Sequence, residues 1–388
     1  MNKDLAISIS SGKFRKIREW NRRKNYYLKE VKLNIAIYIA KLIWDKRKKS
    51  TFDIKSIKTI LLLRNEGTIG DMVVYSPLVR SLHESGYTID VLLTKSSSVV
   101  MKYNPYVRNI YEAGDGNSEV YLKRFNHTVP DSTIKALNNN KYDLVIDPSL
   151  FDTPVHRMQL LHDINARSVL GFNKWNNINH YSKSLFFKCG KEHVTTAVSL
   201  IADCMEVNSI SLHPYNLHLP DSILDEVRGY LHSWGNKKKV IINIFTGSPE
   251  RCFSQEQLAK IIELINKTYA DIEFILLDHR KEITLSLPDN VVINPFGTLH
   301  HVMALIHEAD LVISPDTSIV HMSAAWEKPL ISVYKKVLNN NDLWAPGYAN
   351  ASQIIVQHRM MSEVEDIPER ILQEINHRGL LECKQETL

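Results

Sequence analysis

Short apolar runs alternate with amphipathic stretches along most of this chain, and the alternation restricts the folds open to it. The runs TILLL and TIDVLLT flank a helical pattern over residues 71–84. A second series starts at KKKVIINIFTG and continues through IEFILLD, DLVISPD and LISVY, with helical patterns between most of these runs. Buried strands that alternate with helices are typical of parallel sheets covered on both faces. The sequence therefore predicts an α/β protein with two Rossmann-like domains.

The chain length agrees with that division, because 388 residues suit about two domains. The polar stretch HLPDSILDEVRGYLHSWGNKKK separates the two series. We expect a basic N-terminal extension over residues 1–55, one Rossmann-like domain over residues 56–218 and a second over residues 219–388.

The positive charge of the chain is concentrated in one segment. Between Lys13 and Lys49 there are 14 Lys or Arg residues and three acids, a net charge of +11. Because the whole chain carries +5, the remainder carries −6. A basic arm on an acidic body indicates contact with an anionic surface through residues 13–49. No RNA-binding module accompanies the arm, so we expect no nucleic-acid partner.

Apolar residues recur along this arm near helical spacing, and aromatic residues accompany them. The apolar stretch from Leu33 to Trp44 has about 12 residues, well short of the roughly 20 that span a bilayer. An amphipathic helix lying on anionic lipid fits this pattern, and a basic helix packed on the protein body is the alternative. The stripe consists of Leu28, Val31, Ile35, Ile39 and Leu42.

Polar clusters follow three of the predicted strands. Ligands of open parallel sheets bind beyond the carboxyl ends of the strands, so clusters from both halves predict a cleft between two domains. The clusters are Gly67, Thr68, Gly70 and Asp71 after ILLLR; Thr246, Gly247, Ser248 and Arg251 after VIINIF; and Asp316, Thr317, Ser318 and His321 after LVIS.

Two of these clusters suit an anionic ligand. TGSPER offers backbone N–H groups, hydroxyls and the Arg251 guanidinium to a diphosphate, although a helix cap with a surface arginine would look the same. In SPDTSIVH, Thr317 and Ser318 open a helix and His321 follows one turn later. An ordinary N-cap with a core histidine is the alternative there.

Asp71 sets the remaining cluster apart from a phosphate loop. A P-loop would carry a lysine there, and a dinucleotide site would show G-x-G-x-x-G; the segment RNEGTIGDMVVYSP shows neither. A carboxylate in a glycine-lined turn can instead accept a proton from a substrate hydroxyl. The alternative is that Asp71 only caps the helix over residues 71–84.

Four stretches in this order and spacing resemble glycosyltransferase family 9, the ADP-heptose:lipopolysaccharide heptosyltransferases. IGDMVVYSPLVRSL is similar to the opening signature of that family, and SPDTSIVHMSAAWEKPLISVY to its C-terminal signature. FTGSPERCFSQEQLAKII resembles the donor-phosphate loop, and TLHHVMALIHEADLVIS the elements that precede the last motif. The resemblance covers roughly residues 57–335.

The resemblance implies a GT-B fold, with the acceptor on the N-terminal domain and the nucleotide sugar on the C-terminal domain. It implies an inverting, metal-independent transfer of heptose from ADP-L-glycero-D-manno-heptose to the lipopolysaccharide core, with no cofactor. Asp71 matches the general base, with Gly67, Thr68 and Gly70 in the acceptor-side loop. The donor-binding residues that it implies are Thr246, Gly247, Ser248, Arg251, Asp316, Thr317, Ser318 and His321.

Two departures from the family pattern leave the donor and acceptor open. Ser318 stands where the family usually has glycine, and RCF replaces a basic-basic-Trp sequence. A transferase that uses another nucleotide sugar, or that modifies capsule, O-antigen or protein, therefore remains an alternative. So does a non-catalytic scaffold in a glycan assembly complex. A nicotinamide-dependent oxidoreductase is disfavoured because the glycine fingerprint is missing.

The four cysteines are scattered without a C-x-x-C pair, which argues against a zinc site or a disulfide framework and fits a reducing compartment. From the cysteine pattern, the basic arm and the resemblance, we expect a cytoplasmic protein that is peripheral on the inner membrane of a Gram-negative bacterium. The cysteines are Cys189, Cys204, Cys252 and Cys383.

Overall fold

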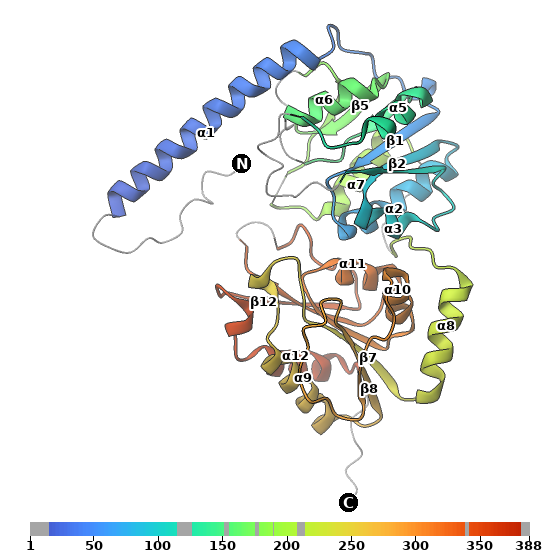
Figure 1. Cartoon of the computed structure of the whole chain (residues 1–388), viewed down its shortest axis with the longest axis vertical. Coiled ribbons are helices and arrows are strands. Elements are labelled where there is room, and N and C mark those ends of the chain that lie inside the picture. The colour runs from blue at the N-terminus through green and yellow to red at the C-terminus, as the bar shows by residue number, and fades with distance from the viewer. Residues whose placement is uncertain are drawn as a thin grey trace, which may run out of the picture. The chain divides into compact units, whose positions relative to one another are not determined.

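The computed structural model describes residues 15–114, 126–150, 155–174, 178–188, 190–207, 214–337 and 341–381. Within this part the chain forms two compact units (Figure 1). The first unit comprises residues up to 66 together with 86–95 and 108–187. The second comprises residues 67–85, 96–107 and 188 onward. Cys189 and Cys383 lie outside the described residues.

The first unit contains a parallel sheet whose strand order is β3-β2-β1-β4-β5-β6. Its register pairs Ile60 with Ile89 on one side and with Leu144 on the other. The order of the strands reverses between β1 and β4, so this edge is the topological switch point where ligands of such sheets bind. The strands are β1 (Thr59–Arg64), β2 (Thr88–Thr94), β3 (Asn109–Ala113), β4 (Leu144–Ile146), β5 (Ser168–Phe172) and β6 (Tyr181–Leu185).

The second unit repeats this topology with the order β12-β11-β10-β7-β8-β9. Its switch point lies between β7 and β10, where Ile242 pairs with Ile313. The strands are β7 (Lys238–Asn243), β8 (Ile272–Leu277), β9 (Val291–Ile293), β10 (Leu311–Pro315), β11 (Leu330–Lys335) and β12 (Ala351–Val356).

Helices account for most of the remaining described residues, and two hydrophobic cores form, one in each unit. The first unit holds α1 (Arg15–Trp44), α5 (Asp131–Asn140) and α6 (Val155–Ile164). The others are α2 (Ile69–Glu84), α3 (Lys95–Met101), α7 (Val194–Cys204), α8 (Asp221–Leu231), α9 (Gln255–Thr268), α10 (Leu299–Glu308), α11 (Ser318–Ala325) and α12 (Ile367–Arg378). Short 3₁₀ turns are η2 (Ile54–Ser56), η3 (His232–Trp234), η4 (Pro249–Arg251) and η5 (Met361–Glu363).

The predicted α/β architecture with two Rossmann-like sheets is therefore confirmed. Strands β6 and β12 lie at sheet edges and were not predicted from the sequence. Both carry polar residues that interrupt an apolar run, YSKSL in β6 and ASQIIV in β12. The polar stretch between the two series forms α8, whose buried residues are Val227 and Leu231.

The C-terminal end of α1 is part of the first unit's core. Ile37 is 6% exposed and Ala40 is 0% exposed, and both belong to the hydrophobic cluster that includes residues of α6 and the sheet. Figure 1 shows the N-terminal part of α1, in blue, extending away from the strands of this unit. Residues 15–44 of the predicted arm thus form one continuous helix that is anchored at its C-terminal end.

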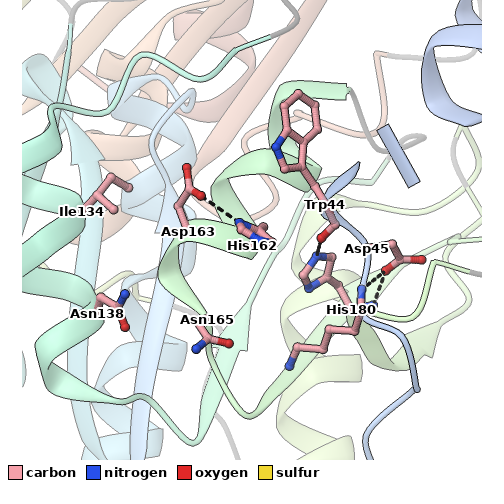
Figure 2. Close-up of a pocket in the computed structure, with 9 residues that line it drawn as sticks. Trp44, Asp45, Ile134, Asn138, His162, Asp163, Asn165 and His180 are labelled. Carbon is pink, nitrogen blue, oxygen red and sulfur yellow. Dashed lines mark hydrogen bonds and ion pairs between the residues drawn. The ribbon is translucent and has the colours of Figure 1, made fainter. Parts of the chain in front are cut away.

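Hydrogen bonds fix that anchored end, beside a pocket of about 440 Å³ (Figure 2). The ring Nε2 of His180 lies 2.7 Å from the carbonyl oxygen of Trp44, which closes the last turn of the helix. The carboxylate of Asp45 accepts from the backbone N–H groups of Asn179 and His180 at 2.9 and 3.0 Å. Lys46 donates to the carbonyl oxygen of Ala166 at 2.6 Å.

Burial lowers the pKa of His180, although its contact with the Trp44 carbonyl acts in the opposite direction. A neutral imidazole with its proton on Nε2 matches this geometry, because the carbonyl oxygen can only accept. We call this attachment of Trp44, Asp45 and Lys46 to the first unit the joint. It combines apolar packing with hydrogen bonds, one of which satisfies the carbonyl oxygen of Trp44 at the end of the helix.

The apolar stripe predicted along the arm faces away from this joint. Leu28, Ile35, Ile39 and Leu42 are exposed and Val31 is half-buried. The protein body thus packs against a different face of α1 from the predicted stripe. Among the residues that the structure describes, no helix is both long and apolar enough to cross a membrane.

Two neighbouring isoleucines of α1 give a matched test of this arrangement. Ile37→Ala should reduce the free energy of unfolding by about 2–4 kcal/mol, because it leaves a cavity in the core. Ile35→Ala, at a side chain that is 55% exposed, should change it by no more than about 0.5 kcal/mol. Chemical denaturation of the two variants measures both values. Equal losses of unfolding free energy would contradict the burial of the Ile37 face and the exposure of the Ile35 face.

Candidate active site

The hydroxyl group of Thr246 closes the loop after β7. The Thr246 hydroxyl donates to the carbonyl oxygen of Ser248 at 2.6 Å and accepts from the Ser248 N–H at 3.0 Å. Gly247 lies between them, and a Cβ added there would meet no atom within 4 Å. The short helix η4 then carries Arg251. The predicted phosphate loop therefore forms a compact turn at the carboxyl end of β7.

Asn243, the last residue of β7, joins this loop to the end of β10. Its amide nitrogen lies 3.0 Å from the Ser314 hydroxyl, 3.0 Å from the Phe245 carbonyl and 3.5 Å from the Thr317 hydroxyl. The Asn243 side chain is buried, so these bonds satisfy a polar group that would otherwise be costly to bury. Asn243 was not predicted from the sequence, although an asparagine within the apolar run VIINIF signals such a role.

The N-terminus of α11 lies at the same edge of the sheet. Thr317 is the N-cap, with extended backbone, and its hydroxyl accepts from the Ile319 N–H at 3.2 Å. Ser318 is the first residue of the helix. The exposed N–H groups of a helix start favour a negatively charged ligand.

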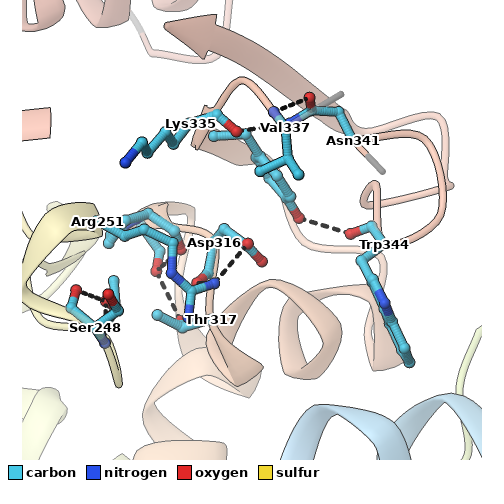
Figure 3. A network of polar contacts seen from close by, with 12 residues as sticks. Ser248, Arg251, Asp316, Thr317, Lys335, Val337, Asn341 and Trp344 are labelled. Atoms are coloured by element: carbon cyan, nitrogen blue, oxygen red, sulfur yellow. Dashed lines mark hydrogen bonds and ion pairs between the residues drawn. The ribbon is translucent and has the colours of Figure 1, made fainter. Parts of the chain in front are cut away.

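Arg251 and Asp316 form an ion pair across the two loops, with 2.8 Å between Nη1 and Oδ2 (Figure 3). Burial raises the pKa of Asp316 above its ordinary value, and the guanidinium of Arg251 opposes that shift. Both side chains are about one-third exposed, so the pair remains accessible to a ligand. The structure thus brings together the two donor clusters that the sequence predicted.

Two further cations accompany Arg251 and were not predicted. Arg280, which follows β8, donates to the Thr246 carbonyl and lies over the ring of Phe245. Lys335, at the end of β11, pairs with Glu250 at 2.7 Å. Basic residues directly after strands of the same sheet were the available signal, since the carboxyl ends of parallel strands share one edge.

His321 is only 4% exposed and lies inside the second unit. Its ring centroid is 6.2 Å from that of Tyr215 and 5.9 Å from that of Trp344. The His321 ring lies against Gly70 of α2. A Cβ added at Gly70 would lie 2.8 Å from Cδ2 of His321 and 3.6 Å from the Cα of Ser318. The close approach of α2 to α11 therefore requires a glycine at position 70.

Asp71 belongs to the first turn of α2. The helix begins at Ile69 and its N-cap is Thr68, so Asp71 is the third residue of the helix and not the N-cap of the alternative interpretation, although it takes part in a capping box with Thr68. Its Oδ2 accepts from the Thr68 N–H at 2.6 Å and from the Thr68 hydroxyl at 2.8 Å. Gly67 precedes the cap. A carboxylate at this position satisfies an N–H of the helix start, as in a capping box.

Asp71, Arg251, Asp316 and His321 all belong to the second unit. The contact at Gly70 sets the helix start that carries Asp71 against the helix start that carries Ser318. A carboxylate thus lies in the same unit as a cluster of cations and a helix N-terminus. Carboxylates can accept protons, and cations and helix starts can stabilise anions.

A second polar cluster lies at the switch point of the first unit and was also missed. Arg157, which is buried, donates to Asn65 and Glu66, both at 2.6 Å. His156 Nε2 lies 2.6 Å from the other oxygen of Glu66. Burial alone would raise the pKa of Asp147, but Arg157, Lys174 and hydrogen bonds from neighbouring side chains bring it to about 2. This network anchors the end of β1 immediately before Gly67.

The described ranges contain no group of three or more His, Cys, Asp or Glu side chains placed to hold a metal ion. Cys252 is a free thiol. It lies against the predicted phosphate loop, with its sulfur 3.3 Å from the Thr246 backbone nitrogen.

Comparison with known proteins agrees with this fold. The model of glycosyltransferase family 9 (heptosyltransferase) matches residues 131–368. The Escherichia coli (strain K12) protein named "Putative lipopolysaccharide heptosyltransferase 4" is 24% identical over 342 residues, which cover 87% of this chain and 91% of that protein.

Two solved structures share the architecture. A glycosyltransferase of family 9 from Veillonella parvula has a TM-score of 0.66 at 14% identity, over 82% of this chain and 96% of its own. The ADP-heptose lipopolysaccharide heptosyltransferase II of Escherichia coli has a TM-score of 0.61 at 17% identity, over 82% and 98%.

The two Rossmann-like sheets and these likenesses define a GT-B fold. The family match extends over more than half of the chain, and the chain belongs to glycosyltransferase family 9, the heptosyltransferase family.

The contact between Gly70 and His321 gives a direct test of the site's construction. Gly70→Ala should reduce the free energy of unfolding by about 1–3 kcal/mol, because the added methyl group overlaps a buried ring. Gly229→Ala, in α8 where an added Cβ meets nothing within 4 Å, should be neutral or stabilise by up to about 1 kcal/mol. Thermal and chemical unfolding of both variants measure these changes in the free energy of unfolding. A stabilised Gly70→Ala would show that helix propensity outweighs the predicted clash.

Proposed function

We propose that this protein transfers heptose from ADP-L-glycero-D-manno-heptose to the lipopolysaccharide core, with inversion and without a metal ion. Family membership supports heptose transfer, and the names of its relatives point to ADP-heptose and lipopolysaccharide. The observation that carries the proposal is the Arg251–Asp316 pair at the N-terminus of α11, in the same unit as Asp71.

The donor diphosphate binds at the loop after β7. Arg251 is held by Asp316 at 2.8 Å, and Arg280 is held by the carbonyl of Thr246, so both cations are positioned before a ligand arrives. Lys335 adds a third positive charge from the end of β11. A guanidinium can bind two phosphate oxygens at once, and the start of α11 supplies N–H donors. These groups offset the charge of the leaving ADP in place of a metal ion.

The sugar lies beside Asp316 and Ser318. The carboxylate of Asp316 accepts hydrogen bonds from heptose hydroxyls while it keeps its contact with Arg251. The Ser318 side chain narrows this part of the pocket, since the family usually has glycine at that position. His321 supports the start of α11 from within the core, where its ring contacts Tyr215 and Trp344.

Asp71 acts as the general base. It takes the proton of the acceptor hydroxyl while that oxygen forms a bond to the anomeric carbon. The bond from the anomeric carbon to the diphosphate breaks on the opposite side, and ADP leaves with the electron pair. A single displacement of this kind inverts the anomeric configuration.

The acceptor places the enzyme at a membrane. We assign it to the cytoplasmic face of the inner membrane of a Gram-negative bacterium, as a peripheral protein. Residues 13–49, with a net charge of +11, contact the anionic lipid surface.

A second candidate keeps the same chemistry but changes the substrates. Ser318 and the sequence RCF at residues 251–253 depart from the family pattern next to the donor. They favour a different nucleotide sugar, or a capsule, O-antigen or protein acceptor, if the heptose donor is not used. Turnover of a panel of nucleotide sugars separates the two candidates.

Asp71→Asn should lower turnover by about 10²–10⁴-fold, the usual scale for loss of a general base. The amide oxygen still accepts from the Thr68 N–H, so the melting temperature and ADP affinity should be retained. Asp221→Asn, the same change in the first turn of α8, is the control and should leave turnover unaltered. Turnover of Asp71→Asn within about threefold of the parent would leave Asp71 a capping residue only.

Arg251→Ala should weaken ADP binding by about 1.5–3 kcal/mol, the contribution of a charge-assisted hydrogen bond. Arg228→Ala, which removes a surface ion pair with Glu308, should leave the affinity unchanged. Isothermal calorimetry with and without EDTA measures both effects. Binding that requires added Mg²⁺ would contradict neutralisation of the diphosphate by side chains.

A further inference from the structure

Helix α1 has two apolar faces, and the body of the first unit covers only one of them. The covered face carries Ile37 and Ala40. Ile35 and Ile39 lie two residues to either side of Ile37, about 200° away around the helix, and are exposed. Leu42, one turn beyond Ile39, is 71% exposed.

The exposed face continues toward the N-terminus at the same spacing. It reaches from Leu42 to Ile17, which is about 37 Å along a helix axis. Its members recur at intervals of three, four and seven residues, so they form one stripe. The exposed apolar and aromatic side chains of this stripe are Ile17, Trp20, Tyr27, Leu28, Ile35, Tyr38, Ile39 and Leu42.

Positive charge accompanies the stripe. Lys24 lies 5.4 Å from the ring of Trp20, and Arg23 and Lys32 are exposed along the same helix. Of the three acids between residues 13 and 49, Asp45 is bound within the joint by backbone N–H groups. An exposed apolar stripe bordered by cations matches the boundary between anionic headgroups and acyl chains.

We infer that the Ile17–Leu42 face of α1 inserts into the headgroup region of an anionic membrane, so that the helix lies in the plane of the lipid surface. This inference rests on the proposed membrane location and specifies the surface that makes the contact. Trp and Tyr side chains suit that region because one end of each is apolar and the other is polar.

A second copy of the chain fits the stripe less well. Pairing two α1 helices through this face would bring together two helices that each carry nine Lys or Arg residues and two acids, a net +7. Packed helix axes lie about 8–10 Å apart, which is comparable with the Debye length of about 8 Å at physiological salt, so screening leaves part of the repulsion between these charges in place. An anionic surface instead attracts the same charge.

The joint makes this contact consequential for the enzyme. Because Trp44, Asp45 and Lys46 are bonded to the first unit, α1 does not hang from a loose linker. Insertion of the stripe therefore fixes the orientation of the first unit relative to the lipid surface.

Two pairs of substitutions with the same change in charge test the inference in the full chain. Ile35→Glu with Ile39→Glu removes apolar surface and adds two negative charges. Asn25→Glu with Asn34→Glu adds the same charge at exposed polar positions of α1. Binding is measured by co-sedimentation with phosphatidylglycerol-containing vesicles at low and high salt, with phosphatidylcholine vesicles beside them.

The asparagine pair should weaken binding by about fivefold per added charge at low salt, and much less at high salt. The isoleucine pair should weaken it further, by at least about 10-fold per site, at both salt concentrations, because the lost apolar burial is not screened. Equal losses for the two pairs would overturn insertion and leave only surface attraction.

Sedimentation velocity without lipid supplies the second outcome. A monomeric parent chain supports the lipid surface as the occupant of the stripe. A dimer that Ile35→Glu with Ile39→Glu dissociates would assign the stripe to a second copy and overturn the inference. Transfer by the parent chain to a soluble acceptor is measured separately, so a missing transferase activity would count against the proposed function without altering the binding comparison.

Discussion

The order of the strands in the second sheet is the constraint on which the proposed donor site depends. Because β7 lies next to β10 although they are the first and fourth strands of that sheet, the loops that follow them leave from one edge. Asn243 bonds this edge together through Ser314 and Thr317. This order of strands brings Arg251 and Asp316, one residue from each loop, close enough to pair. A buried asparagine at the switch point thus connects the sheet topology to the chemistry of the site.

The approach of α2 to α11 is the second constraint. Two helix starts meet where Gly70 faces His321 and Ser318, and a larger residue would separate them. Each helix start has backbone N–H groups without a partner inside the helix, but different groups lie beside them. Asp71 binds the cap of α2 through Thr68, whereas the start of α11 lies beside Arg251 and Asp316. One helix start therefore carries a carboxylate and the other remains suited to an anion, which is the charge separation that an inverting transfer requires.

The sequence predicted the central strands because they are apolar and bounded by polar residues, and it predicted Arg251, Asp316 and Asp71 because these follow strand ends. It missed Arg280 and Lys335, whose proximity to the phosphate loop depends on the lateral order of strands. The position of Arg280 and Lys335 near strand ends is a signal for the shared edge of the sheet, but the lateral order of the strands, which decides which loop they lie beside, leaves no local signal. The alternative that Asp71 is the N-cap differs from the structure because Thr68, three residues earlier, is also a good cap and takes that position. On α1, periodicity identified one apolar stripe. The burial of Ile37 and Ala40 on the other face depends on tertiary packing against the first unit.

The central claim is that this family 9 enzyme moves heptose from ADP-heptose to a lipopolysaccharide core acceptor by inversion, with side chains in place of a metal. Incubation of the protein with that donor and acceptor in EDTA, followed by mass spectrometry and NMR of the product, tests it most directly. We expect an acceptor that has gained one heptose, released ADP, and an anomeric configuration in the product opposite to that of the donor. A product that retains the donor configuration, or transfer that stops when EDTA is added, would contradict it.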